Sequence, residues 1–594
     1  MILIMVPRPV FTSTLKSKFC LVLLALFLSL ITIPVSAQTA VSVEITGLDQ
    51  TLETNVRLFL SIEQQKNHLL MSVGRLQRLH KKAIAEISTA LQPYGYYRPR
   101  IDSSLTKSES GEWQASYIID PGQVIPIAEF NFTISTEVAE DPAFVDLLQE
   151  NTLQSGAAFS HLEYEKFKGS LAKLAAERGY FDAGFTDHRV EIDLNHYLAR
   201  IHLNFVGGIR YRFGEIVLRQ DALEQDFIQR FIPFKQGDPY TLEKLVELQR
   251  VLNDTEYFQT AEVSTGKPLI DLHEIPVEVS LIPRKQNRYE FGLGYGTDTG
   301  ARAKIGWSVP RVNKAGHRFS SEIEVSEIGH NLLANYRVPV LNPRTDQIVY
   351  SAGEKVEEFE DTESTLQTLG ISLVHNRGGW RETLAVNYQQ EDFESGDDSG
   401  NSTLLIPGIG WSRIWGRGFI NVIDGLRFDL SLRGASESLI SDTDFSQLKT
   451  QLKFISSINP QNRFIVRGEF GGTSTSNFEQ LPSSIRFFAG GAQSVRGYRY
   501  QSLGPTDEND EVVGGAFLIL GSIEFEHYFN DRWGAALFYD IGNAVDDLDD
   551  DLERGAGFGL RWKSPVGPVR FDLANAISSD DKPWRLHINI GPDL

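Results

Sequence analysis

From Arg288 onward, apolar and polar residues alternate along the chain, and the pattern recurs in segment after segment to the C-terminus. In residues 288–296 the aromatic side chains and Leu293 share one face, whereas Glu290 and three glycines share the other. A period of two predicts β-strands, and apolar outer faces opposed to polar inner faces are typical of membrane barrels. A soluble sandwich also alternates, but its strands rarely carry charges on the inner face so consistently. We therefore expect residues 288–594 to form an antiparallel transmembrane β-barrel of about sixteen strands.

Acidic and glycine-rich stretches between these strands predict surface loops, and residues 394–401 and 546–553 are of this kind. An even number of strands would return the C-terminus to the side of the membrane on which the barrel begins. Carboxylates in residues 546–551 could hold a divalent cation, but their spacing is not that of an EF-hand. A solvated acidic loop is the favoured interpretation.

Before the barrel, residues 41–285 repeat loosely at intervals of about eighty residues. Each unit contains an amphipathic helix, a turn rich in aromatic residues and one or two strands. The apolar faces expected for two of these helices are Leu171, Leu174 and Ala175, and Leu242, Leu245 and Val246. Each unit is therefore predicted to be a small α/β module, and a set of unrelated α/β domains is the alternative. The predicted boundaries are 38–125, 126–208, 209–287 and 288–594.

Residues 1–37 have the pattern of a secretory signal peptide. Two lysines precede an apolar core at residues 19–33, and Val35 and Ala37 occupy the positions of small residues before a cleavage site. We expect cleavage after Ala37, and an amino-terminal anchor helix is the alternative. Because Cys20 is the only cysteine, the mature chain would contain none.

The composition excludes several classes of function. The formal net charge is −21 and no basic stripe occurs, so nucleic acid is not an expected partner. After residue 40 no run of about twenty apolar residues occurs, which a helical membrane protein would need. The chain also lacks the zinc-protease, nucleophile-elbow and phosphate-loop motifs. We therefore expect no catalytic activity, no metal and no cofactor.

Three motifs near the C-terminus carry the most specific signal. They contain Val495, Arg496, Gly497 and Tyr498 in a glycine-rich loop, Phe538, Asp540 and Gly542 on a strand, and Gly567, Pro568, Arg570 and Asp572 beyond it. In this order, at the end of a barrel, they resemble the outer-membrane insertase superfamily that includes BamA and TamA. The preceding repeats resemble POTRA modules, so the resemblance covers essentially the whole mature chain.

The resemblance implies that the tip of the glycine-rich loop folds into the barrel lumen, where its arginine meets acidic residues on neighbouring strands. Matched by motif, those acids are Glu524 and Asp540. The alternation of the two strands independently places both carboxylates on the inner face. An arginine fork suits this role because its planar donors pair bidentately with carboxylates.

Three POTRA modules before a sixteen-stranded barrel are typical of the TamA branch. This resemblance implies a bacterial outer-membrane protein with periplasmic modules, the barrel subunit of a translocation and assembly module. Its implied role is to insert, fold or secrete other outer-membrane proteins, autotransporters among them. The implied partners are a TamB-like inner-membrane-anchored protein, unfolded outer-membrane protein clients and outer-membrane lipids. A two-partner-type pore that exports one dedicated substrate is the alternative. The arginine motif and the repeats disfavour a passive porin.

The two strands that must close the barrel look weak. Their key residues are Tyr289, Gly292 and Gly294 on the first strand and Leu586, Ile588, Gly591 and Pro592 on the last. Glycine adds backbone freedom, and proline has no N–H to donate to a ladder. We expect this seam to open as a lateral gate for client strands, and ordinary closure with a frayed tip is the alternative.

Overall fold

The computed structural model describes residues 41–67, 71–109, 111–417, 422–564 and 567–590, which form two compact units divided between Tyr211 and Arg212. The leader expected at residues 1–37 lies outside the described residues, as do Gly591 and Pro592 of the predicted seam. No helix within the described ranges is long and apolar enough to cross a membrane.

The first unit begins with an α+β module. Its elements are β1 (Val41–Thr46), α2 (Gln50–Phe59), α3 (Ser61–Gln65), α4 (Val73–Leu91), η1 (Gln92–Tyr94), β2 (Arg100–Lys107) and β3 (Trp113–Asp120). Leu76, Ala83 and Ile87 recur on one face of α4 and are buried in the module's core. The sheet has the order β1–β3–β2, in which β1 runs parallel to β3 and β2 runs antiparallel.

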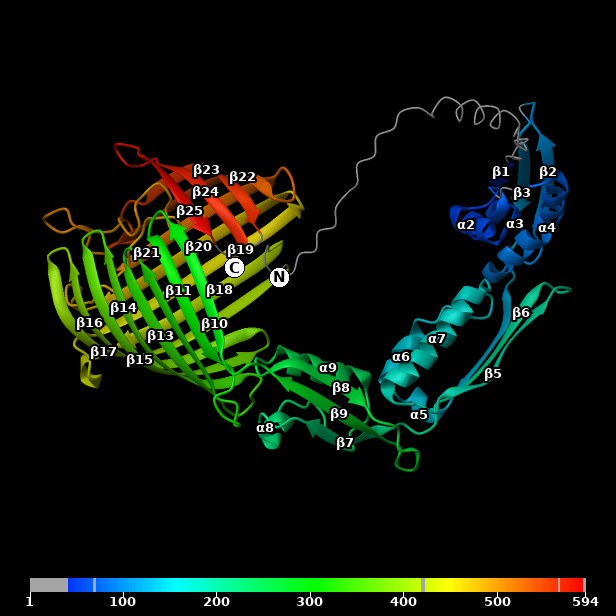
Figure 1. Ribbon diagram of the computed structural model, residues 1–594, viewed down its shortest axis with the longest axis horizontal. Coiled ribbons are helices and arrows are strands. Elements are labelled where there is room, and N and C mark those ends of the chain that lie inside the picture. Colours follow the sequence, from blue (N-terminus) through cyan, green and yellow to red (C-terminus); the bar gives the residue numbers. More distant parts are fainter. Residues whose placement is uncertain (1–40, 68–70, 110, 418–421, 565–566, 591–594) are drawn as a thin grey trace, which may run out of the picture. The chain divides into compact units, whose positions relative to one another are not determined.

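The second module repeats this plan. Its elements are β4 (Ile127–Ile134), α5 (Thr136–Ala139), α6 (Pro142–Gln149), α7 (His161–Arg178), β5 (Gly184–Asp193) and β6 (Leu198–Val206). Figure 1 shows α6 and α7 on one face of the sheet, whose order is β4–β6–β5. Leu171 and Ala175 are buried in this core, as the spacing predicts, and Leu174 packs at its edge. Helix α7 ends at Gly179, whose φ of 89° forms a left-handed cap.

The third module belongs to the second unit. Its elements are β7 (Arg212–Arg219), α8 (Gln225–Gln229), α9 (Leu242–Asp254), β8 (Phe258–Thr265), η2 (Ile270–Leu272) and β9 (Glu274–Pro283), with the sheet order β7–β9–β8. The apolar face predicted for α9 is partly wrong. Leu245 is buried, but Leu242 and Val246 are exposed, and the buried stripe continues through Leu248 and Leu252. The helix is thus rotated relative to the predicted face, because apolar residues occur on both sides of Leu245.

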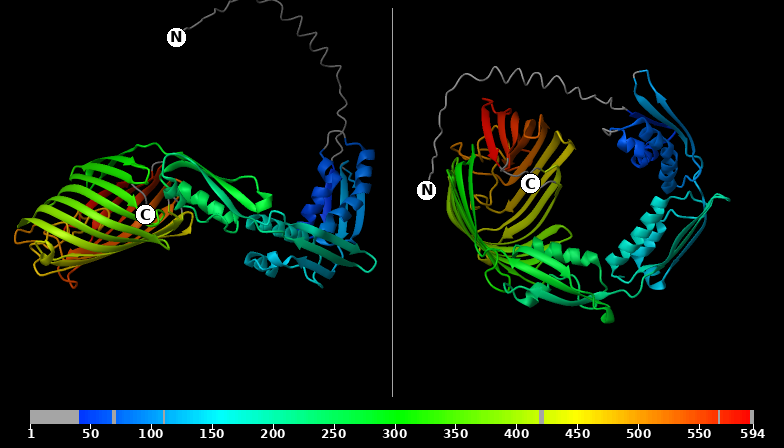
Figure 2. Two further views of the ribbon diagram at one scale, coloured as in Figure 1. Left: turned by 90° about the horizontal axis from the view of Figure 1, so that it is seen from below. Right: turned by 45° about the vertical axis from the view of Figure 1, so that its right-hand side comes forward.

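The remaining strands form one antiparallel sheet of sixteen strands, which confirms the predicted barrel class and strand number. Figure 2 shows how the sheet curves so that its two ends approach each other. The strands are β10 (Arg288–Gly296), β11 (Gly300–Val309), β12 (Arg318–Ser326), β13 (Gly329–Pro339), β14 (Asp346–Phe359), β15 (Thr362–Arg377), β16 (Trp380–Ser395), β17 (Asp398–Arg417), β18 (Asp424–Ala435), β19 (Phe445–Asn459), β20 (Asn462–Thr475), β21 (Phe517–Tyr528), β22 (Trp533–Val545), β23 (Glu553–Ser564), β24 (Gly567–Ala576) and β25 (Trp584–Ile590). Each pairs with the next along the chain, so the strand alternation sorts side chains into an inner and an outer face.

One predicted surface loop is instead mostly strand. Residues 394–401 were expected to form a loop because they are rich in Asp, Gly and Ser. In the structure β16 continues to Ser395 and β17 begins at Asp398, so only the two residues between them make the turn. Ladder pairing between β16 and β17 reaches this turn and overrides the local preference of these residues for loops. The second predicted loop, residues 546–553, does connect β22 to β23.

The third module is bound to the turns at the end of the barrel where β10 begins. The buried hydroxyl of Tyr257 donates to the carbonyl of Gly316 in the β11–β12 turn at 2.7 Å. A Cβ at Gly316 would overlap the ring of Phe227, and the φ of 77° at this glycine disfavours any side chain. Two exposed ion pairs, Arg318 with Glu256 and Arg344 with Glu247, lie around this contact. The third module therefore contacts both the β11–β12 and the β13–β14 turns.

We expect Tyr257→Phe to loosen this junction by about 1 kcal/mol, because it removes one buried hydrogen bond and keeps the ring. Faster amide hydrogen exchange in the β11–β12 turn, residues 310–317, is the measurement. Tyr164→Phe is the matched control, since it deletes an equivalent bond to the His188 carbonyl inside the second module. Unchanged exchange in residues 310–317 would show that the hydroxyl does not hold the junction.

Candidate functional site

A long segment between β20 and β21, residues 476–516, folds inside the barrel, and we call it the lumen loop. Two apolar clusters hold it against the wall. Leu481 and Ile485 pack with side chains of β17 and β19, and Phe487 and Ala489 pack with side chains of β21 and β22. Short bridges join Phe487 to Gly515 and Ala489 to Leu503 within the loop. The loop is therefore an ordered part of the barrel interior, and Arg496 with its neighbouring motif residues lies on it.

Arg496 lies in a cage of carboxylates from the barrel wall, and its side chain is only 2% exposed. Its Nε and Nη2 donate to the two oxygens of Asp540, at 2.7 and 2.9 Å. Its Nη1 donates to Glu524 at 2.7 Å and to Asp572 at 3.1 Å. The guanidinium also lies over the ring of Phe538, 3.5 Å from the ring centre. The structure thus brings the loop arginine together with both acids predicted for it, and with a third.

A second arginine completes this cluster from β23. Arg561 is 1% exposed and donates to Glu524 at 2.6 Å, to Asp572 at 2.5 Å and to Glu526 at 2.8 Å. Glu526 in turn accepts from Arg463 of β20. Buried carboxylates need such partners because isolated charges in a low-dielectric interior are very costly. The loop arginine is therefore one member of a network, and Glu524 does not depend on it alone.

The residues beside Arg496 fix the loop tip by close packing. Val495 is fully buried, and Gly497 has a φ of 104°, a left-handed conformation that favours glycine. A Cβ at Gly497 would lie 2.8 Å from the backbone nitrogen of Ala576, so the tip lies directly against β24. The hydroxyl of Tyr498 donates to the Glu553 carboxylate. Burial and this carboxylate raise the pKa of Tyr498 to about 12, so the hydroxyl stays protonated.

The other predicted motif residues lie around the same loop tip. Phe538 and Gly542 are on β22, and Asp572 and Arg570 are on β24, where Arg570 pairs in register with Arg561. Asp572 is 5% exposed and joins the two buried arginines, a role that its motif alone did not predict. Gly567 and Pro568 begin β24, and their side chains lie outside the described part of the chain.

The seam between β10 and β25 differs from every other strand junction. The sheet order places these two strands at its ends, and no ladder joins them within the described residues. One backbone group is seen to cross the seam there: the N–H of Ile588 donates to Thr297 Oγ1 at 3.4 Å. On β10, Leu293 is 91% exposed and Phe291 is 78% exposed, against 46% for Ile323 and 60% for Leu369, which point outward on the paired wall. Tyr289 is also exposed, and Leu586 and Ile588 lie on β25. Gly292 and Gly294 face the lumen beside Lys304 and Arg302.

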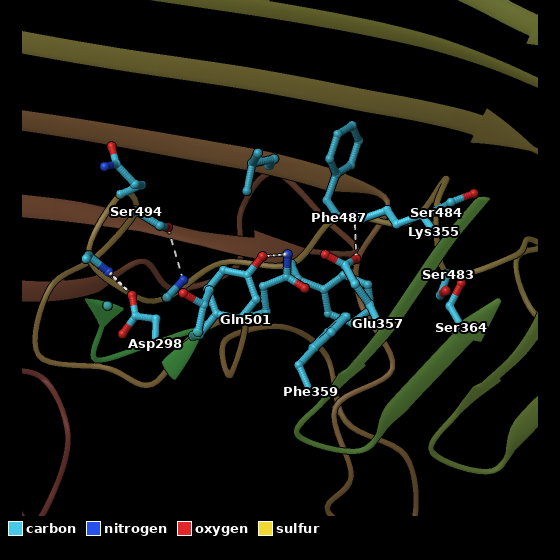
Figure 3. A pocket seen from close by; sticks show the side chains of 18 of the residues that line it. Asp298, Lys355, Glu357, Phe359, Ser364, Ser483, Ser484, Phe487, Ser494 and Gln501 are labelled. Carbon is cyan, nitrogen blue, oxygen red and sulfur yellow. Dashed lines mark hydrogen bonds and ion pairs between the residues drawn. The ribbon is translucent and has the colours of Figure 1, made fainter. Parts of the chain in front are cut away.

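A cavity of about 780 Å³ lies between the lumen loop and the wall (Figure 3). Asp298 and Ser494 lie at one end of the view, and Ser364, Ser483 and Ser484 lie at the other. Residues 296–299 and 588–590, which are the two sides of the seam, line it as well. Charged side chains in the cavity pair with each other, as Lys355 does with Glu357. The lumen beside the seam therefore offers charged and polar side chains, together with apolar ones, to the inner face of an entering strand.

Some residues of the site could not have been found from their sequence context. Arg561, Glu526, His587 and Asp298 belong to it. Arg561 ends the glycine-alternating stretch at residues 555–561 that precedes the Gly567 motif, but that stretch predicted no partner for it, and the other three stand in no segment with a specific signal. The strand alternation does put Arg561, Glu526 and His587 on inner faces. On the outer rim, Asp397, Asp507 and Glu511 bring carboxylate oxygens within 4.8 Å of one another, but exposed acidic groups of this kind are common and we assign no ion to them.

Comparison with known proteins places these features in context. The Omp85 superfamily domain model matches residues 286–593, and a model described as POTRA domain TamA domain 1 matches residues 42–121. Outer membrane protein assembly factor BamA of Nitratidesulfovibrio vulgaris is 23% identical over 370 residues, which are 58% of this chain and 46% of the relative. BamA of Neorickettsia risticii is 21% identical over 472 residues, which are 73% of this chain and 61% of the relative. The matches thus span only about half of those proteins.

Among solved structures, BamA from Haemophilus ducreyi lacking POTRA domains 1–3 superposes with a TM-score of 0.66 at 16% identity. The superposition covers 79% of this chain and 99% of that chain. At this level of identity the likeness shows the fold.

Proposed function

Because this chain belongs to the Omp85 superfamily, we propose that it is an assembly factor that inserts and folds other proteins in the outer membrane. The barrel lies in the outer membrane and the three modules lie in the periplasm. The proposed role needs binding and strand pairing and no catalytic side chain.

The seam is the observation that carries this proposal. In lipid, each unsatisfied backbone group costs several kcal/mol, so membrane barrels close with a full ladder. Here the described ends of the sheet meet through side-chain contacts, from Thr297 to the N–H of Ile588 and from Asp298 to His587. The edge of β10 is then available to hydrogen-bond with a client strand, whose alternating side chains would face lipid and the polar lumen. The lumen loop keeps the rest of the wall rigid while this edge is used.

Two observations support a TamA-type protein within the superfamily. The chain has three modules before the barrel, and the first of them matches the model described as POTRA domain TamA domain 1. We therefore propose that the protein is the barrel subunit of a translocation and assembly module, with autotransporters among its clients and outer-membrane lipids around its seam. The proposed partner is a TamB-like inner-membrane-anchored protein. The sheet of the first module leaves β1 and β2 as edge strands, which can accept a partner's strand.

Purification of the full chain from its own membranes in mild detergent, with mass spectrometry of what co-purifies, tests this assignment. We expect a large inner-membrane-anchored protein in the complex. A single exported substrate in its place would support the two-partner-type secretion pore and overturn the TamA-type assignment.

A further inference from the structure

His587 on β25 joins three parts of the barrel that the backbone ladder does not connect. Its imidazole is 1% exposed, and its Nε2 accepts the N–H of Gly497 in the lumen loop at 3.0 Å. Its Nδ1 lies 3.4 Å from Oδ1 of Asp298, in the turn between β10 and β11. The last strand, the loop tip and the first hairpin therefore meet at one side chain.

Asp298 makes the same connection from the other side of the seam. Its Oδ2 accepts the N–H of Ala492 at 2.6 Å, so the carboxylate binds the lumen loop as well as His587. Its neighbour Thr297 accepts the N–H of Ile588. Within the described residues, the contacts across the seam at this end thus come from the short turn at residues 297–299.

The protonation of this pair follows from its hydrogen bonds. Because Nε2 of His587 accepts the Gly497 N–H, a neutral imidazole carries its proton on Nδ1, which faces Asp298. Burial acts to raise the pKa of Asp298, but the His587 side chain and the Ala492 N–H hold it below its ordinary value. At 3.4 Å the contact brings the Nδ1 side of the imidazole close to the carboxylate without an aligned hydrogen bond, so the attraction across the seam is electrostatic.

The other carboxylate near His587 is already engaged. Asp572 is the register partner of His587 on β24, and it accepts from Arg561 at 2.5 Å and from Arg496 at 3.1 Å. Among the described residues no arginine or lysine forms an ion pair with Asp298, and its charge is directed at His587. The pairing of Asp298 with His587 is thus distinct from the arginine network and crosses the seam, which that network does not.

We propose that Asp298 and His587 form a latch that holds the outer end of the seam closed and couples its opening to the lumen loop. The proposal rests on the lateral opening proposed above. Asp298 and His587 are positioning residues: they hold β10 and β25 together, and neither needs to touch the client. Separating the strands breaks the Asp298–His587 contact, and movement of the loop tip removes the Gly497 bond that orients the imidazole.

Two substitutions of one residue separate the two bonds. In His587→Gln the side-chain oxygen reaches the Nε2 position and keeps the Gly497 bond but loses Asp298. In His587→Asn the amide reaches the Nδ1 position and keeps Asp298 but loses Gly497. Asp298→Asn keeps an acceptor for Ala492 and removes the charge.

The readout is the distance between spin labels on cysteines at Tyr295 and Leu586, which point outward on the two sides of the seam, in the purified full chain. Labels at Ile323 and Leu332, paired in register on β12 and β13, are the control. We expect His587→Gln and Asp298→Asn to increase the separated population about tenfold, with the control pair unchanged, and His587→Asn to increase it less. A separated population equal to the parent's in both His587→Gln and Asp298→Asn would overturn the latch.

Client assembly measured on the same variants distinguishes the latch from the proposed function. A seam that separates in Asp298→Asn while clients assemble as before supports the latch and contradicts the gate. A seam that stays closed in Asp298→Asn, in a protein whose locked seam blocks assembly, contradicts the latch and leaves the gate intact. A heat-dependent shift in electrophoretic mobility checks that each barrel is folded.

Discussion

A disulfide across the seam is expected to reduce client assembly at least tenfold while the barrel remains folded. Cysteine pairs would join residues 292–296 of β10 to residues 586–590 of β25. Tyr295 is the first choice with Ile588, because both point outward and the two backbones approach here: a Cβ at the adjacent Gly296 would lie 3.9 Å from the Ile588 carbonyl oxygen. The covalent bond removes the separation of the strands, so the β10 edge cannot pair with a client. Assembly of a reporter client into membranes, with and without reductant, is the measurement.

Controls for the locked seam come from the paired wall. Ala334→Cys with Ala352→Cys joins register partners on β13 and β14 and leaves the seam free. We expect this variant to assemble clients normally after oxidation, and reductant to restore the seam variant. The lateral gate is ruled out if a seam locked by a verified disulfide assembles clients at the unlocked rate.

Arg496→Ala is expected to release the lumen loop and to reduce client assembly at least tenfold, with a smaller effect on barrel folding. Removing one partner of a buried ion pair costs about 3–5 kcal/mol. That cost falls mainly on Asp540, because Glu524 and Asp572 keep their bonds to Arg561. Asp540 would keep the Ser522 hydroxyl and a longer contact to Arg467 at 3.8 Å. Protease accessibility of residues 476–516 and client assembly are the two measurements. Arg499→Ala is the matched control, because Arg499 lies on the same loop but is exposed and pairs with Glu360.

The double variant Arg496→Ala with Asp540→Asn separates charge from loop position. Asn removes the buried charge that has lost its closest partner, so we expect the barrel to regain much of its thermal stability. The loop tip would still lack its anchor, so client assembly should remain low. Recovery of assembly in the double variant would show that the loop position is irrelevant, and failure of Arg496→Ala to reach the membrane would show that the arginine is structural.

The strand alternation predicted the barrel because lipid on one side and a polar lumen on the other act on every residue of a strand. The strand number followed from length, since the 307 residues of 288–594 suffice for about sixteen strands of about ten residues plus loops. The same alternation placed Glu524 and Asp540 on the inner face. It could not predict that Arg561 and Asp572 share the cage with Arg496, because inward residues on four strands meet only when the sheet curves.

The sequence predictions failed where tertiary contacts overrode the local preferences of the residues. The acidic stretch at residues 394–401 has the composition of a loop, yet backbone hydrogen bonds between β16 and β17 continue through most of it. On α9 the apolar residues form two overlapping stripes, and only packing against the sheet selects the one that contains Leu248. A single histidine between Leu586 and Ile588 carries no signal of its own, and its role follows from two elements distant in sequence.

The grip of the third module on the barrel has a mechanical consequence. Only residues 284–287 separate β9 from β10, and the same module holds the β11–β12 turn through Tyr257 and the β13–β14 turn through Glu247. We therefore expect the third module and the first strands of the barrel to move together as one rigid unit. A force on the three periplasmic modules is therefore transmitted to the β10 side of the seam. The other side, β25, is held by β24 and the lumen loop. Tension from a partner bound to the first module would thus load the two sides of the seam unequally, and force applied in the periplasm would be converted into strain at the outer rim.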